Sequence, residues 1–133
     1  MTATESEAIL TLSIMAGFAD GVNNEAGRAQ FKRVAENLLQ AELQPADLYH
    51  RVLLQPATIA QAILPLKTAE SREYAYEMAV CICDADAVQT DAEREFLIKL
   101  RTCLKLEPEK AAAIQQQRPF LQIKPWTRGR VNE

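Results

Sequence analysis

The feature that most constrains the fold is a short acidic stretch between two helical patterns, at residues 83–97. An apolar helical pattern ends there, four acidic residues follow within ten positions, and an amphipathic pattern begins. A fainter copy occupies residues 18–25, with an Asp-Gly pair at Asp20 and Gly21. Two such corners predict two similar helical units, because each unit has an apolar face that the other can cover.

Helical periodicity accounts for almost the whole chain up to residue 117. Capping-box patterns begin at Thr4 and Thr90, while Pro45 and Pro108 are suited to the first turns of later helices. The expected helices cover residues 4–19, 24–39, 46–54, 58–64, 68–84, about 90–104 and 108–117. Val22 and Val88 are the only strand-like residues in the two corners, so no sheet is predicted.

The same order of helices occurs twice along the sequence. A buried helix, an acidic corner, an amphipathic helix and a proline-started helix occupy the first half, and the same series recurs from residue 68. The first three expected helices therefore match the fifth, sixth and seventh. We expect an all-α, compact bundle of about seven helices with an internal pseudo-repeat of three, in which the helices at 4–19 and 68–84 are central neighbours.

Charge divides the chain into a body and a tail. The length of 133 residues and an apolar content of 48% suit one soluble domain, which we assign to residues 1–117. The net charge is −3, yet the last sixteen residues carry four Lys or Arg and one Glu. The body is therefore acidic, which argues against nucleic acid as a partner, because phosphate binding requires a cationic surface.

The cysteines and the apolar runs indicate a cytoplasmic protein. Cys81, Cys83 and Cys103 are odd in number, and two of them lie in an apolar helical pattern, so we expect reduced, buried thiols. The apolar run at residues 9–19 is too short to cross a bilayer, and no integral membrane segment is predicted. The one histidine, His50, is expected to be a partly exposed helix residue.

The tail, residues 118–133, has a different composition from the body. Pro119 and Pro125 exclude a long helix, and four apolar residues alternate with basic ones: Phe120, Leu121, Ile123 and Trp126. One interpretation is an extended arm packed along the acidic body. The other is a segment that docks on a protein partner or contacts a membrane surface peripherally through Trp126 and its basic neighbours.

The two corners carry a family resemblance. The apolar helix that ends in Ala-Asp-Gly at residues 19–21, followed by Ala-Tyr-Glu-Met-Ala-Val-Cys-Ile-Cys-Asp-Ala-Asp at 75–86, resembles the TerB-like tellurite-resistance family. The same fold is similar to the membrane-proximal domain of a DnaJ-type co-chaperone. The resemblance covers roughly residues 5–117. It implies an all-helical domain with a non-enzymatic, stress-linked scaffolding or sensing role, and acidic corner residues that bind a divalent cation.

The resemblance places the metal residues on particular positions. The family's Asp-Gly corner falls on Asp20-Gly21 and on Asp86-Ala87, and its later acidic residue falls on Glu93. In the first corner that later position is Gly27, so the two corners are not equivalent. With Asp84, which lies beside Asp86, the candidate metal set is Asp20, Asp84, Asp86 and Glu93, for Ca²⁺ or Mg²⁺.

The same carboxylates have a purely structural interpretation. Clustered carboxylates repel one another, and a hard cation with several oxygen ligands relieves that repulsion. However, Asp91 and Glu93 fall in the first turn of a helix, where negative charge is favoured, and Asp84 and Asp86 can bond turn amides. The spacing does not fit an EF-hand, because Val88 and Gln89 stand where a ligand and a glycine are needed.

No arrangement of catalytic residues is recognisable, so a non-enzymatic role is predicted. A remote alternative is a metal-dependent hydrolase in which Asp20 and Asp86 converge in an acidic cleft. The other alternative is a metal-free interaction module. Such a module would dock through the tail or through an exposed apolar patch, for example around Tyr49, Val52 and Ile59.

Overall fold

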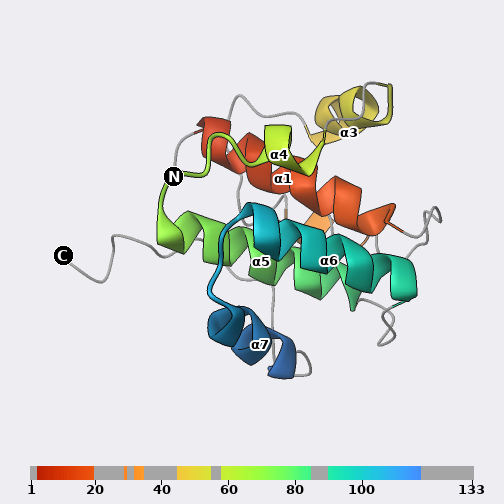
Figure 1. The fold of residues 1–133 in the computed structure, drawn as a ribbon. Helices are drawn as coiled ribbons and strands as arrows, with labels where there is room; N and C mark the ends of the chain where they lie inside the picture. Colours follow the sequence, from red (N-terminus) through yellow and green to blue (C-terminus); the bar gives the residue numbers. More distant parts are fainter. Residues whose placement is uncertain are drawn as a thin grey trace.

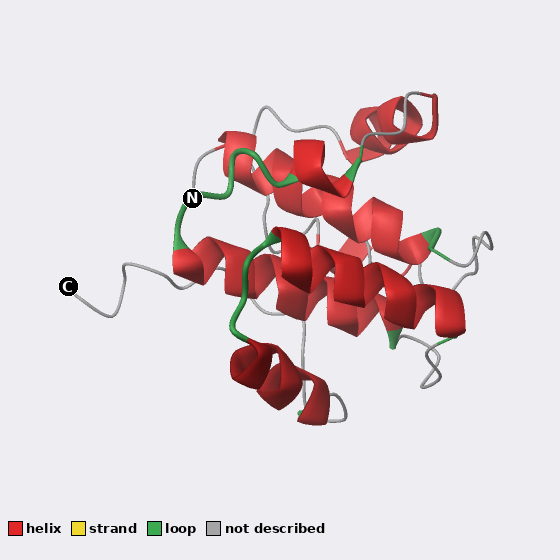
Figure 2. Cartoon of the chain, viewed as in Figure 1, coloured by secondary structure: helices red, strands yellow, loops and turns green. Residues whose placement is uncertain are grey.

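The computed structural model describes residues 3–19, 29, 32–34, 45–54, 58–84 and 90–117. Within these ranges every regular element is a helix and none is a strand (Figure 2). The helices are α1 (Ala3–Gly17), α3 (Pro45–Leu54), α4 (Ile59–Ala62), α5 (Ala69–Cys83), α6 (Asp91–Cys103) and α7 (Pro108–Gln116). Residues 29 and 32–34 are also helical and fall within the second expected helix. The predicted all-α class is confirmed.

The centre of the fold is the pair α1 and α5. Among the described helices these two make the most extensive contact, and α1 also packs against α3, α4 and α6. Both run in the same direction, while α6 returns antiparallel to α5 (Figure 1). Buried residues lie all round α1, including Ile9, Leu10, Leu12 and Ile14. The expectation of two buried, neighbouring central helices is therefore confirmed.

Local capping chemistry sets several helix boundaries. Thr68 precedes α5, and its hydroxyl accepts a hydrogen bond from the Ser71 amide. Thr58 and Gln61 form a capping box at α4, in which the Gln61 side chain accepts from the Thr58 amide. Each side chain satisfies an amide that the helix itself leaves without a partner, which explains why these boundaries were predictable.

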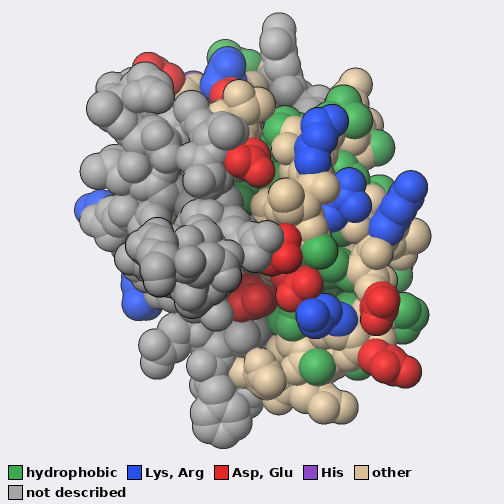
Figure 3. Space-filling model, turned by 90° about the vertical axis from the view of Figure 1, so that its left-hand side faces the viewer, with side chains coloured by type: hydrophobic (Ala, Val, Ile, Leu, Met, Phe, Trp, Pro, Cys, Tyr) green, Lys and Arg blue, Asp and Glu red, His purple; other side chains and the backbone are tan. Residues whose placement is uncertain are grey.

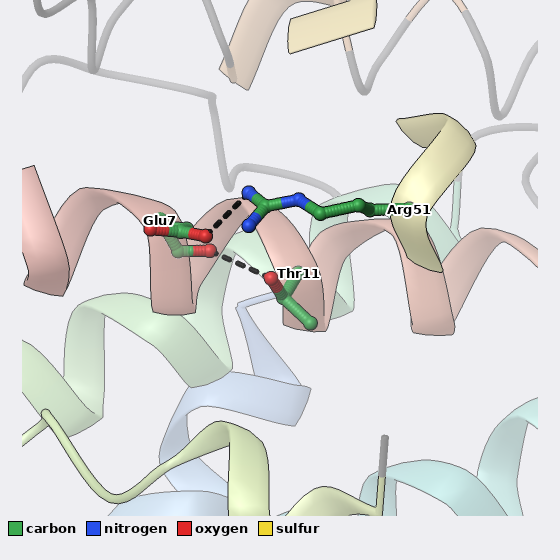
Figure 4. Close-up of polar contacts among 3 residues, drawn as sticks. All are labelled: Glu7, Thr11 and Arg51. Atoms are coloured by element: carbon green, nitrogen blue, oxygen red, sulfur yellow. Dashed lines mark hydrogen bonds and ion pairs between the residues drawn. The ribbon is translucent and has the colours of Figure 1, made fainter. Parts of the chain in front are cut away.

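The capping box predicted at Thr4 is wrong. Helix α1 already includes Ala3, so Thr4 lies inside the first turn and is not the N-cap. The carboxylate of Glu7 has a distant partner instead, because Arg51 of α3 donates from Nη2 to its Oε1 at 2.6 Å (Figure 4). The Glu7 carbonyl accepts from the Thr11 hydroxyl at 2.8 Å. A tertiary ion pair between α1 and α3 thus replaces the expected local bond.

Helix α7 is attached to α5 by two polar contacts. The Gln115 side-chain amide donates to the Tyr76 hydroxyl at 3.2 Å, and Lys110 pairs with Glu73 at 3.3 Å. Burial raises the pKa of Tyr76, although the bond from Gln115 and the charge of Arg101 act in the opposite direction. The α5–α7 contact therefore combines one buried phenol with a more exposed ion pair.

The structure tests the predictions about the cysteines, the histidine and membrane-spanning segments, but not those about the tail. Cys81 and Cys83 are buried and Cys103 is half-buried, none of the three is in a disulfide, and His50 is exposed as expected. No helix in the described ranges is long and apolar enough to span a bilayer. The tail at 118–133 lies outside the described residues, so its two interpretations stay predictions.

Candidate functional site

Asp84 lies where α5 ends. It is the C-cap residue, and its backbone amide donates to the Val80 carbonyl at 2.9 Å, which closes the last turn of the helix. Its side chain is half-buried. A carboxylate at this position lies beside the negative end of the helix dipole, which does not stabilise the helix. Asp84 is therefore placed where a cation would be favourable.

Glu93 lies across the corner, in the first turn of α6. Its carboxylate Oε1 accepts from the Thr90 amide at 2.8 Å, and its own amide donates to the Thr90 hydroxyl at 3.1 Å. The predicted capping box is confirmed, and the residue is only 7% exposed. The negative charge of Glu93 thus interacts favourably with the positive end of the α6 dipole, and one of its carboxylate oxygens already accepts a hydrogen bond.

The ends of α1 and α5 lie side by side. The Cys83 thiol of α5 lies 3.9 Å from the Ala16 carbonyl of α1. A Cβ placed on Gly17 would lie 3.8 Å from the Ile82 side chain, an ordinary van der Waals distance, so the two helices also pack together at this level. Since both helices finish here, their negative dipole ends are adjacent. The described parts of the two acidic corners therefore start from neighbouring points at one end of the bundle (Figure 1).

The structure locates two of the four predicted metal residues. Asp84 and Glu93 are at this end of the bundle, whereas Asp20 and Asp86 lie outside the described residues. Across the ranges that are described, no three His, Cys, Asp or Glu side chains group closely enough to hold a metal ion. The four-residue set, and the hydrolase alternative that needs Asp20 and Asp86 together, therefore stay predictions.

Exposed apolar side chains lie elsewhere than predicted. Val52 and Ile59 are half-buried and pack against the core, and the side chain of Tyr49 is not among those described. Among the side chains that the structure describes, the exposed large apolar ones are instead Leu54, Leu64 and Ile98, at 80%, 67% and 50%. Leu54 ends α3 and Leu64 closely follows α4. Both therefore lie at helix ends, where hydrophobic periodicity does not reliably predict which side chains face the core.

Comparison with protein-family models, curated proteins and solved structures finds no match to this chain.

Proposed function

We propose that this chain is a non-enzymatic, TerB-like helical domain that acts as a stress-linked scaffold or sensor. In this proposal a divalent cation, Ca²⁺ or Mg²⁺, binds weakly at the bundle end where α1 and α5 finish. The observation that carries the proposal is the 3.9 Å approach of the Cys83 thiol to the Ala16 carbonyl, which brings two helix C-termini together. Two aligned helix ends and nearby carboxylates create a negative potential that a cation reduces.

The proposal includes the internal pseudo-repeat. In support, α3 and α7 both begin at a proline, Pro45 and Pro108, after the two amphipathic segments. The parallel pairing of α1 and α5 also fits two units related by an axis along the bundle (Figure 1). Under that relation both acidic corners face the same end, so Asp20 and Asp86 contribute to one site with Asp84.

The roles of the four carboxylates differ in this proposal. Asp20, Asp84 and Asp86 supply the principal oxygens. Glu93 contributes mainly through its charge, because its Oε1 is held by the Thr90 amide. Few ligands and one engaged carboxylate predict weak binding, with a dissociation constant on the order of 0.1–1 mM. A site of this affinity responds to large changes in cation concentration, which suits a sensor more than a permanent structural metal.

Calcium and magnesium titrations by isothermal calorimetry test the proposed site. The parent chain is expected to bind one cation, and Asp84→Asn and Asp86→Asn are each expected to weaken binding about tenfold by removing one charged ligand. Glu93→Gln is expected to weaken it less and to leave the fold intact, because Gln61 performs the same capping role in α4. Asp47→Asn, an exposed acid on α3, is the matched control and should have no effect.

The outcome that contradicts the proposal is clear from the same series. If the parent chain gives no heat and no thermal stabilisation at millimolar calcium or magnesium, there is no cation site. Equal affinities in the parent, Asp84→Asn and Asp86→Asn would place the cation elsewhere. In either case the carboxylates of this corner serve capping and solvation alone.

A second candidate function is a metal-free protein-interaction module. The exposure of Leu54 and Leu64 favours it, because large apolar side chains at the surface are common in docking sites. If the module acts through these residues, Leu54→Ser together with Leu64→Ser should abolish capture of a partner in a pull-down. If it acts through the tail, deletion of residues 118–133 should abolish capture instead. Dependence on calcium in either experiment favours the cation sensor.

A further inference from the structure

A pocket lies at the opposite end of α5 from the acidic corner. It has a volume of about 320 Å³ and is lined by Ala69, Arg72 and Glu73 of α5, by residues 104–107, which link α6 to α7, and by Lys110. This volume is at the small end of the range for ligand pockets, roughly 300–1,000 Å³. The pocket joins segments that are far apart in the sequence, so its geometry depends on how α5 and α7 pack.

Arg72 is held in a fixed orientation at this pocket. Its Nε donates to the Leu66 carbonyl at 2.8 Å, and the side chain is half-buried. Within the described residues its terminal amino groups make no further hydrogen bond or ion pair. A guanidinium presents its donors in a planar fork that matches the two oxygens of a carboxylate. The terminal donors of Arg72 therefore suit a planar anion such as a carboxylate.

Lys105 is a second cationic residue in the pocket lining, and its backbone conformation is unfavourable for a lysine. Its φ of 58° is in the left-handed region, and it is the one non-glycine residue in the described chain with a positive φ. The Lys105 amide donates to the Thr102 carbonyl and the Leu106 amide to the Arg101 carbonyl, both at 3.1 Å. This is the Schellman arrangement, whose left-handed position usually holds glycine. Lys105 therefore adopts a backbone conformation that a lysine does not favour, and this exposed residue lines the pocket.

The remaining lining residues define the size and charge of a ligand. The three cations at the pocket exceed its two acids by a single charge, and the Lys110–Glu73 pair is satisfied internally. Glu107 is the N-cap of α7 but makes no side-chain capping bond. Leu106 and Ala69 supply the accessible apolar part of the lining, while Leu104 behind them is fully buried. The lining therefore suits a ligand with one negative charge and an aliphatic part.

We propose that this pocket binds a small aliphatic monocarboxylate. The carboxylate lies between the Arg72 guanidinium and the Lys105 ammonium, and the aliphatic part contacts Leu106 and Ala69, which are accessible from solvent. Figure 3 looks onto the end of the molecule where α5 begins, and there Lys and Arg side chains lie beside Asp and Glu side chains. Because the surroundings are mixed in charge, a multiply charged anion gains less than a single carboxylate.

The test is a titration of the full chain with sodium butyrate, followed by NMR chemical shifts at constant ionic strength. Saturable shifts are expected at residues 66–73 and 104–110. Sodium phosphate and n-butanol are the comparison probes. Phosphate has negative charge but no aliphatic part, and butanol has the aliphatic part but no charge. Both are expected to bind more weakly than butyrate. Phosphate binding as tightly as butyrate, or butanol doing so, would overturn the proposal.

Matched variants separate binding from folding. Lys105→Gly removes the ammonium and relieves the positive φ, so butyrate affinity should fall about three- to tenfold while the melting temperature does not fall. Glu107→Gln removes an opposing charge and should raise the affinity about two- to threefold. Lys99→Gln, an exposed lysine elsewhere on α6, is the control. Unchanged affinity in both Lys105→Gly and Arg72→Gln would refute the assignment.

Discussion

Replacement of Leu12 by alanine is expected to lower the free energy of unfolding by about 2–5 kcal/mol. Leu12 lies in the middle of α1 and is 0% exposed, so the truncation removes buried apolar area and leaves a cavity between packed helices. Urea denaturation followed by circular dichroism measures the change. The matched control is Leu54→Ala, the same chemical truncation at a side chain that is 80% exposed, for which a change below about 0.5 kcal/mol is expected.

This pair of variants tests the central position of α1 directly. If both truncations cost the same, the core is not organised around α1. A change in the slope of free energy against urea concentration, in addition to the midpoint, would show that the variant also alters the compactness of the unfolded or native state.

Alkaline pH is expected to destabilise the protein through Tyr74. Burial, assisted by the charges of Glu77 and Cys81, raises the pKa of Tyr74 from 10.0 to about 12. The folded state thus favours the neutral phenol. The stabilisation is complete below about pH 10, where the unfolded chain is also neutral, and is lost as pH rises towards 12. The expected loss is on the order of 1–2 kcal/mol, because solvent screens part of the effect.

Urea unfolding at about pH 9 and about pH 12 measures this loss. Tyr74→Phe removes the titrating group and keeps the ring, so its stability should fall less over the same interval. Tyr76→Phe is a useful comparison, because the Gln115 bond and the Arg101 charge offset part of the burial effect on the pKa of Tyr76. Identical losses in the parent and in Tyr74→Phe would mean that other groups govern alkaline unfolding.

Features controlled by neighbouring residues were predictable from the sequence. Thr68 and Thr90 cap their helices, and Pro45 and Pro108 begin theirs, because these effects depend on side chains within one turn. The all-round apolar pattern of the first helix likewise predicted its central position. The prediction at Thr4 was wrong because α1 already includes Ala3, and the Glu7 carboxylate pairs instead with Arg51, which is remote in sequence.

Features that depend on distant segments were not predictable. The Glu73–Lys110 pair and the pocket beside it join the start of α5 to α7, and no local pattern relates these positions. The exposure of Leu64, just after α4, was not predictable either, because an apolar residue near a helix end fits a core or a surface position. A usable signal existed at Lys105, since the end of an amphipathic helix often requires a left-handed residue even where glycine is absent.

The parallel pairing of α1 and α5 has a consequence for how the chain folds. These helices lie next to each other in space but far apart in sequence, so their contact requires the closure of a long loop. The antiparallel α5–α6 hairpin closes over a short corner and is expected to form earlier. During synthesis, α1, whose apolar side chains are buried in the folded protein, emerges well before α5 can cover it. We therefore expect the first half of the chain alone to aggregate, and the fold to be completed only after α5 is available.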